Sequence, residues 1–276
     1  MQRRYFEIDV FAERPYLGNP LGVVVDAAGL SDSAMQEIAA WTNFSETAFL
    51  LPPTDGAADY RVRIFTTDSE LPFAGHPTLG SCRAWLEAGG IASNPDVVLQ
   101  ECGIGLVPVR RGGDTLAFRA PPLLRSGPVE EHVATEVALA VGLARHELVD
   151  LAWIDNGPGW LGVLLDSAEA VLDLAVPSGA RAIGVVGLWP PGGPSAYEVR
   201  AFFPGGAGLL EDPVTGSLHA AVAQWLLASG RVAAPLTATQ GSAVGRSGIV
   251  AVEVDLEGSV WISGAAAVRI AGTIEA

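Results

Sequence analysis

Three side chains of this sequence are suited to moving a proton, namely Glu46, His76 and Asp212. Glu46 stands in NFSETAF, directly before an apolar run. Apolar surroundings favour the protonated form of a carboxyl group, as a general acid or base requires near neutral pH. His76 follows Gly75, and Asp212 precedes Thr215-Gly216-Ser217, each at the expected start of a helix. The three residues therefore indicate proton transfer assisted by hydrogen-bonding groups.

Taken singly, each of these residues also has a structural interpretation. His76 can cap a helix, Asp212 can be an ordinary N-cap, and Glu46 can be an exposed residue at a strand edge. For Glu46 the structural interpretation is favoured by pattern alone. The chemical interpretation of His76 and Asp212 is supported by a sequence repeat, because each residue lies in one copy of it.

One loop-and-helix pattern occurs twice in the chain. The copies are RIFTTDSELPFAGHPTLGSCRAWLEAGG (63–90) and RAFFPGGAGLLEDPVTGSLHAAVAQWLLASG (200–230). Each begins with Arg-x-Phe, continues through a Gly-rich loop with an acidic residue, and ends in a helix that carries Trp-Leu. The repeat predicts two similar halves that present two helix starts to one ligand between them.

The helix starts predict what that ligand carries. The first N–H groups of a helix lack partners within the helix and bear partial positive charge. A carboxylate is well received there. We therefore expect a small-molecule substrate with a carboxylate, bound near Gly75-His76 and near Thr215, Gly216 and Ser217.

The elements that position these residues are many short strands and few helices. This order predicts an α+β fold in which each half is a curved sheet or barrel wrapped around its long helix. Helices are expected over 31–43, 77–88, 129–141 and 167–174, and over a segment that includes 218–226. Strands are expected over 5–11, 21–26, 44–53, 60–65, 97–102, 105–111, 115–120, 151–155, 160–165, 182–189, 197–203, 248–255, 259–264 and 265–272.

The repeat also predicts the domain boundaries. One half comprises residues 1–118 plus about 264–276, and contains Glu46 and the FAGHP loop. The other comprises 119–263 and contains the EDPVTGS loop. A Pro-rich joint, 120–128, separates them.

Composition excludes several classes of protein. The 276 residues are 49% hydrophobic and 17% charged, as in a folded globular protein. A net charge of −15 with only the small basic pairs Arg3-Arg4 and Arg110-Arg111 argues against binding nucleic acid. No run of 18 apolar residues and no signal segment is read, so we expect no membrane association and a cytoplasmic location. The two cysteines make neither a disulfide framework nor a metal spacing, and no metal site is predicted.

Five phrases resemble one protein family. GNP-LGVVV, NFSETAF, RIFTTDSELPFAGHPTLG, EDPVTGS and QGSAVGRSG are similar to the PhzF-like family of phenazine-biosynthesis isomerases, over nearly the whole chain. ELPFAGHPT and EDPVTGS together are the most specific. The resemblance implies a diaminopimelate epimerase-like fold with the active site in the cleft between two halves. It also implies no metal and no organic cofactor, and a homodimer.

The resemblance assigns roles residue by residue. Glu46 matches the catalytic glutamate that moves a proton between carbons of the substrate. Gly75 and His76 match the FAGHP loop, and Asp212 and Ser217 match the EDP-TGS loop. These loops are implied to hold the substrate and assist proton movement. Asn19, in GNP, matches a residue near the family's cleft.

The positions of the cysteines distinguish this chain from racemases of the same fold. Those enzymes are expected to use two cysteines, one at each helix start, where this chain has Ala74-Gly75 and Asp212-Pro213. Cys82 and Cys102 are predicted to be buried core residues. A single carboxylate base suits a double-bond shift.

The predicted function is therefore a cofactor-independent isomerase of a small unsaturated amino or hydroxy acid, expected in secondary metabolism. A hydrolase or C–C-cleaving enzyme using the same cleft is one alternative. A non-catalytic small-molecule binding protein is another. Trp160 has two interpretations, one near the mouth of the cleft and one in packing.

Overall fold

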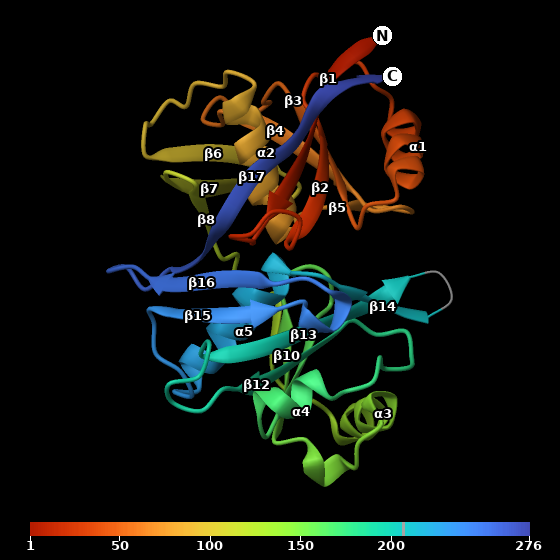
Figure 1. Ribbon diagram of the computed structural model, residues 1–276, viewed down its shortest axis with the longest axis vertical. Helices are drawn as coiled ribbons and strands as arrows, with labels where there is room; N and C mark the ends of the chain where they lie inside the picture. The colour runs from red at the N-terminus through yellow and green to blue at the C-terminus, as the bar shows by residue number, and fades with distance from the viewer. Residues whose placement is uncertain (206–207) are drawn as a thin grey trace. The chain divides into compact units, whose positions relative to one another are not determined.

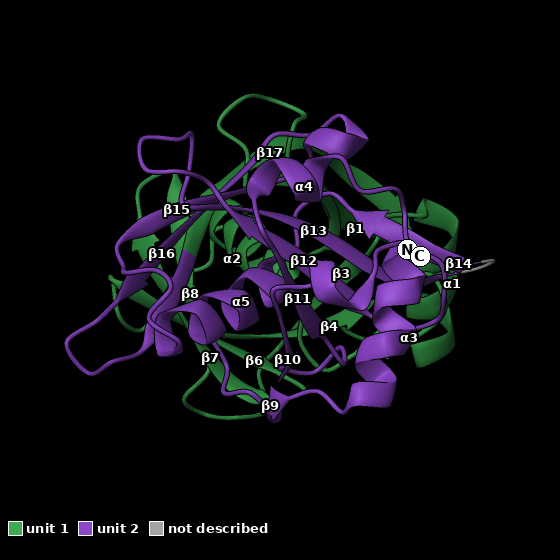
Figure 2. Ribbon diagram, turned by 90° about the horizontal axis from the view of Figure 1, so that it is seen from below, with its two compact units in different colours: residues 1–119, 263–276 green, residues 120–262 purple. Residues whose placement is uncertain are grey.

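The structure, a computed structural model, describes residues 1–205 and 208–276 (Figure 1). The described chain divides into two compact units (Figure 2). Unit 1 comprises Met1–Arg119 and Ser263–Ala276, and unit 2 comprises Ala120–Ile262. Each unit combines many strands with few helices, so the architecture is α+β.

Unit 1 is a ring of strands around one helix. Its helices are α1 (Asp32–Thr42) and α2 (Gly75–Glu87). Its strands are β1 (Gln2–Val10), β2 (Asn19–Val24), β3 (Thr47–Leu51), β4 (Tyr60–Phe65), β5 (Glu70–Leu71), β6 (Val97–Cys102), β7 (Gly105–Gly112), β8 (Thr115–Arg119) and most of β17 (Val260–Glu275).

The ring of unit 1 closes through successive pairings. β17 pairs with β1, which continues through β2, β3, β4, β6, β7 and β8 back to β17. Figure 1 shows α2 running inside these strands. The first eight residues of α2, 75–82, are all buried, because the sequence offers no charged face in GHPTLGSC. The closed ring packs around α2 and thereby fixes where the start of this helix lies.

Unit 2 has the same kinds of elements. Its helices are α3 (Glu131–Val141), α4 (Ala168–Leu172) and α5 (Gly216–Ala228), with short 3₁₀ turns η1 (Arg145–Glu147) and η2 (Ser242–Val244). Its strands are β9 (Arg125–Pro128), β10 (Asp150–Asp155), β11 (Leu161–Leu165), β12 (Ile183–Leu188), β13 (Tyr197–Gly205), β14 (Gly208–Asp212), β15 (Leu236–Gln240), β16 (Gly248–Val254) and the first residues of β17.

The order of elements repeats between the units. β2-α1-β3-β4-β5-α2-β6-β7 of unit 1 corresponds to β11-α4-β12-β13-β14-α5-β15-β16 of unit 2. The parallel pairs also correspond, since β2–β3 and β4–β6 match β11–β12 and β13–β15. The repeated sequence pattern is therefore part of a longer structural repeat.

Several predicted element boundaries were wrong. α2 begins at Gly75, two residues before the predicted start, because Ala74 is already its extended N-cap. The predicted joint contains β9, which pairs with β10 despite its Gly-Pro ending. β5, β14 and β15 were not predicted, and the two strands predicted over 259–272 form one strand, β17.

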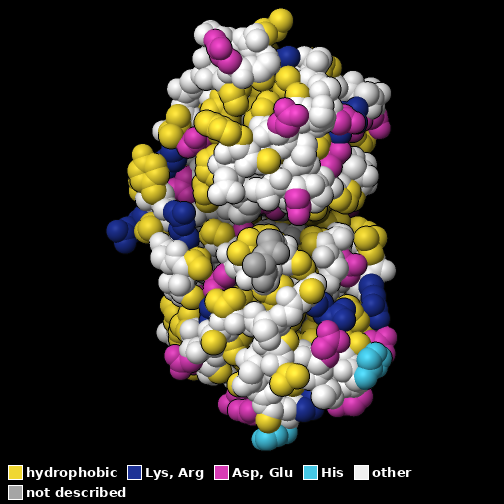
Figure 3. Space-filling view, turned by 90° about the vertical axis from the view of Figure 1, so that its right-hand side faces the viewer, with side chains coloured by type: hydrophobic (Ala, Val, Ile, Leu, Met, Phe, Trp, Pro, Cys, Tyr) yellow, Lys and Arg dark blue, Asp and Glu magenta, His cyan; other side chains and the backbone are white. Residues whose placement is uncertain are grey.

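The surface agrees with the acidic composition of the chain. Figure 3 shows acidic side chains spread over the displayed face among apolar and neutral ones. Within residues 1–205 and 208–276, the helices lack the length and apolarity needed to cross a bilayer.

Candidate functional site

The topology of unit 1 brings together Asn19, Glu46 and His76. β2 and β3 run parallel, so Asn19 at the start of β2 and Glu46 directly before β3 lie at the same edge of the sheet. His76 lies in the first turn of α2. Three segments far apart in sequence thus place one amide, one carboxylate and one imidazole together.

The distances order these three groups around His76. The Asn19 Nδ2 atom lies 3.2 Å from His76 Nδ1, and His76 Nε2 lies 3.7 Å from Glu46 Oε2. With the Asn19 amide in this orientation Nδ2 donates, so His76 Nδ1 accepts and the neutral ring carries its proton on Nε2. That proton faces Glu46 at a distance longer than an ordinary hydrogen bond. The arrangement places a neutral imidazole N–H beside a carboxylate.

Burial determines the charge of His76. The side chain is only 3% exposed, and burial lowers its pKa to about 3. His76 is therefore neutral at physiological pH, and its Nε2–H is available to donate a hydrogen bond to a bound molecule. The Glu46 side chain keeps 16% of its surface exposed, although the Oε2 atom that faces His76 is buried.

A buried carboxylate fixes the loop that leads into Asn19. Asp9 accepts hydrogen bonds from the N–H of Tyr16 at 2.6 Å and of Gly18 at 2.9 Å, and pairs with Arg269 at 3.3 Å. A Cβ atom at position 18 would lie 2.1 Å from the Val10 carbonyl oxygen. The glycine of GNP is therefore required for this close approach, which holds Asn19 in place.

The start of α5 in unit 2 carries a different set of groups. The Thr215 hydroxyl donates to Asp212 Oδ2 at 2.5 Å. Gln240, at the end of β15, accepts from the Thr215 N–H at 2.9 Å and donates to the Asp212 carbonyl at 2.8 Å and to the Thr215 hydroxyl at 3.0 Å. All three side chains are at least nine-tenths buried. The predicted residues Asp212 and Thr215 are thus held in one network.

Ser217 lies in the first turn of α5, after Gly216, and is held from two sides. The Trp160 indole N–H donates to its hydroxyl oxygen at 3.1 Å, and the Asn156 amide donates to its carbonyl at 2.8 Å. Since the hydroxyl oxygen accepts from Trp160, the hydroxyl proton points elsewhere. Trp160 is 3% exposed, so it is a buried anchor for Ser217.

Sequence reasoning missed Asn156 and Gln240. The repeat holds the signal that could have found Gln240, because VVLQEC and LTATQG each place a glutamine late in the strand after the long helix. In unit 1, Gln100 accepts from the Tyr60 hydroxyl at 2.8 Å and donates to the Thr78 hydroxyl at 3.1 Å. A buried polar residue at the same place in both copies of the repeat indicates that each copy uses it to form hydrogen bonds.

Both cysteines lie in the core, as expected. Cys82 lies within α2 and Cys102 ends β6, and both are buried. Burial raises the pKa of Cys82 to about 12 and also raises that of Cys102. Neither thiol is poised to ionise near neutral pH, so this pair does not supply thiolate bases.

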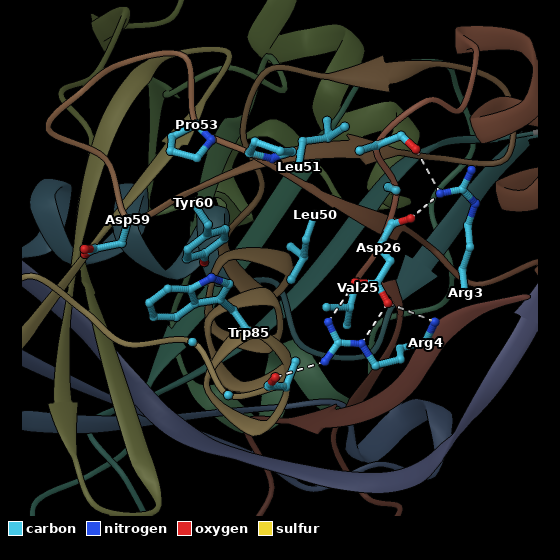
Figure 4. Close-up of a pocket in the computed structure, with 16 residues that line it drawn as sticks. Arg3, Arg4, Val25, Asp26, Leu50, Leu51, Pro53, Asp59, Tyr60 and Trp85 are labelled. Atoms are coloured by element: carbon cyan, nitrogen blue, oxygen red, sulfur yellow. Dashed lines mark hydrogen bonds and ion pairs between the residues drawn. The ribbon is translucent and has the colours of Figure 1, made fainter.

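A hollow of about 510 Å³ lies at the other end of α2 (Figure 4). It is lined in part by Arg4, Asp26, Tyr60, Trp85 and Ala88. Arg4 already forms a bidentate pair with Asp26 and donates to the Ala88 carbonyl, and Trp85 stacks on Tyr60 with ring centroids 5.3 Å apart. Its charged groups are thus engaged within the protein, and it lies about 18 Å along the helix from His76.

Metal ligands do not gather in the described parts of the chain. Across residues 1–205 and 208–276, no three side chains of the His, Cys, Asp or Glu type are arranged to hold a metal ion. The groups near His76 are those of proton transfer and hydrogen bonding.

Comparison with known proteins gives consistent matches along the chain. A family model described as phenazine biosynthesis-like protein matches residues 8–272. The chain is 36% identical to Antisense-enhancing sequence 1 of Schizosaccharomyces pombe, covering 98% of both proteins. It is 37% identical over 174 residues to trans-2,3-dihydro-3-hydroxyanthranilate isomerase of Pseudomonas aeruginosa, covering 61% of this chain and 59% of that one.

Solved structures share the fold. A phenazine biosynthesis protein of the PhzF family from Bacillus anthracis matches with a TM-score of 0.81 and 23% identity, covering all of both chains. A hydroxyproline epimerase from Agrobacterium vitis matches with a TM-score of 0.59 and 17% identity, covering 99% of this chain and 92% of that one. The predicted epimerase-like α+β fold class is therefore confirmed.

Proposed function

Since this chain belongs to the phenazine biosynthesis-like (PhzF) family and is an isomerase, we propose that it moves a proton, and with it a double bond, on a small unsaturated amino or hydroxy acid. The observation that carries this proposal is the position of Glu46, beside the neutral imidazole of His76. A carboxylate can move the proton, and a fixed N–H donor can stabilise the charge that develops on the substrate.

Glu46 is the proposed base. Its carboxylate removes a proton from an acidic C–H, and the electron pair of that bond becomes part of the new double bond. The electron pair of the old double bond then takes a proton back from the Glu46 carboxyl group at another carbon, after that carboxyl proton has exchanged with water. Substrate and product thus have the same composition, and one carboxylate serves both steps.

His76 is the proposed hydrogen-bond donor. Asn19 fixes the ring through Nδ1, and burial keeps the ring neutral, so Nε2 keeps its proton. The N–H can stabilise negative charge that develops when the substrate loses its proton. A neutral ring also leaves Glu46 as the proton acceptor of this cluster.

Each helix start is proposed as a place where groups of a substrate can bind. We expect Gly75 in unit 1, and Gly216 and Ser217 in unit 2, to offer N–H groups to a carboxylate. The Thr215 N–H is already held by Gln240, so Thr215 contributes by holding this turn. Asp212 is expected to accept a hydrogen bond from an amino or hydroxyl group. Asp212→Asn is the variant that tests the second of these roles separately from Glu46.

The test uses trans-2,3-dihydro-3-hydroxyanthranilate, the compound in the name of one relative, as the probe. We expect a product of unchanged mass in water and incorporation of deuterium in D₂O. Glu46→Gln should lower kcat by on the order of 10²–10⁴ while the protein stays folded. Glu37→Gln, at an exposed position of α1, is the matched control and should turn over normally.

Three results would overturn the proposal. Full turnover by Glu46→Gln would exclude this residue as the base. A product that differs in mass by one water or by a lost carbon fragment would instead favour a hydrolase or a C–C-cleaving enzyme. Bound probe recovered unchanged from the wild-type protein would favour a binding protein.

A further inference from the structure

The amide of Gln240 can be oriented in only one way. The atom 2.9 Å from the Thr215 N–H must be the oxygen, because a backbone N–H only donates. The atom 2.8 Å from the Asp212 carbonyl must be the nitrogen, because a carbonyl only accepts. Two backbone groups therefore fix the amide, and Gln240 is only 1% exposed.

This orientation determines where the Thr215 proton goes. The Gln240 nitrogen also lies 3.0 Å from the Thr215 hydroxyl oxygen, to which it donates. The Thr215 hydroxyl then gives its own proton to Asp212 Oδ2, 2.5 Å away. The hydrogen bonds run in one direction, from Gln240 to Thr215 to Asp212, so the Asp212 carboxylate is the acceptor at the end of this series.

We propose that Gln240 and Thr215 are positioning residues that hold Asp212 as a hydrogen-bond acceptor, so that the group it binds on the substrate is a donor, an amine or a hydroxyl. The proposal rests on the proposed function only in taking Asp212 as a substrate contact. It assigns to Gln240 a task beyond packing the end of β15.

Unit 1 supplies an internal comparison. Gln100 occupies the strand after α2, and its amide donates to the Thr78 hydroxyl at 3.1 Å. Thr78 in turn donates to the Ala74 carbonyl at 2.9 Å. The hydrogen-bond chain of unit 1 therefore ends on the backbone, whereas that of unit 2 ends on a carboxylate. The glutamine is common to both units, and its connection to an acid is specific to unit 2.

The activity test compares Thr215→Ser with Thr215→Val. Serine keeps the hydroxyl, and valine keeps the shape without it. With trans-2,3-dihydro-3-hydroxyanthranilate as probe, we expect Thr215→Val to raise KM on the order of 10–100-fold, as loss of a hydrogen bond to a charged group implies. Thr215→Ser should stay within about threefold of wild type, and Gln240→Met should raise KM in the same direction as Thr215→Val.

A merely structural role would have a different signature. It would lower the active fraction, and hence kcat, with KM unchanged. An unchanged KM in Thr215→Val, or a Thr215→Ser variant as impaired as Thr215→Val, would overturn the proposal. If Gln240→Met does not fold, the KM values of the two Thr215 variants still test the proposal.

A second measurement needs no substrate. In urea unfolding of the ligand-free protein, Thr215→Val should raise the unfolding equilibrium constant about tenfold in the wild type and less than threefold in Asp212→Ala. Equal effects in both backgrounds would show that the two side chains are not coupled. This arm separates the two proposals, because an inactive wild type would overturn the proposed function and leave the coupling measurable.

Discussion

The loops before α2 and α5 share one scaffold and differ in the chemistry they carry. In both units the arginine of Arg-x-Phe forms a bidentate pair with a glutamate of the following short strand. Arg63 Nε and Nη2 lie 2.7 and 2.5 Å from Glu70, and Arg200 Nε and Nη2 lie 2.9 and 2.7 Å from Glu211. Each unit also places a tyrosine at the start of the strand that bears this arginine.

The chemical groups themselves are not duplicated. Glu46 directly precedes β3, and the residue directly before the corresponding strand β12 is Ala182. The first turn of α2 holds His76, and that of α5 holds Ser217. The comparison indicates that both units share the loop and the ion pair that precede the long helix. The proton-moving carboxylate is proposed for unit 1 alone.

The largest expected difference concerns the two arginine–glutamate pairs. The Arg200 and Glu211 side chains are 4% and 5% exposed, whereas those of Arg63 and Glu70 are 17% and 40% exposed. Glu211→Gln leaves a buried arginine without its counter-charge and should lower the free energy of unfolding by about 3–5 kcal/mol. Glu70→Gln should cost about 1 kcal/mol or less. Urea unfolding measures the free energy lost in each variant. Equal losses would contradict the view that burial makes the Arg200–Glu211 pair the more important of the two.

A second difference lies at the fourth residue of each long helix, which is the buried His219 in α5 and Thr78 in α2. Burial lowers the pKa of His219 to about 4, with a smaller opposing effect from Gln240. The unfolded chain takes up this proton near pH 6.5, so acidification from pH 6.5 to about 4 favours unfolding by up to about 1.4 kcal/mol per pH unit. His219→Thr should reduce the pH slope of the unfolding free energy by that amount.

The pH measurement compares slopes, since carboxyl groups contribute in every variant. His132→Thr, at an exposed position of α3, is the matched control. A slope in His219→Thr that equals the wild-type slope between pH 6.5 and 4 would show that His219 does not stay neutral in the folded protein.

The smallest expected effect concerns the anchor of Ser217. Trp160→Phe keeps most of the ring and removes the N–H that donates to the Ser217 hydroxyl. We expect a loss of about 1 kcal/mol in the free energy of unfolding. Trp41→Phe, at a position 84% exposed, should change stability by a few tenths at most. Equal effects of the two substitutions would show that the Trp160 N–H does not help to hold Ser217.

The general fold could be predicted from the sequence because its signals are local. YRVRIF alternates, and it forms β4 with a matching alternation of burial. The long apolar helices predicted after each Gly-rich loop are the core helices α2 and α5. Strand β9 was missed because its pairing with β10 overrides the Gly-Pro that ordinarily marks a turn.

The residues of the candidate site could be proposed from the sequence, whereas the hydrogen bonds among them could not. FAGHP and EDPVTGS identified His76 and Asp212, yet the tautomer of His76 depends on Asn19, which lies more than fifty positions earlier in the chain. Gln240 is likewise distant from Thr215 in sequence and meets it only through the pairing of β13 with β15. Contacts set by strand pairing between distant segments cannot be read from local pattern.

Strand β17 has a consequence for how the protein is made. Residues 263–276 complete the ring of unit 1 by pairing with β1 and β8, and they are translated after the whole of unit 2. Unit 1 therefore cannot close its ring between β1 and β8 before the residues that follow unit 2 have been synthesised. Unit 2 comprises one continuous stretch of chain, Ala120–Ile262, and has no such requirement.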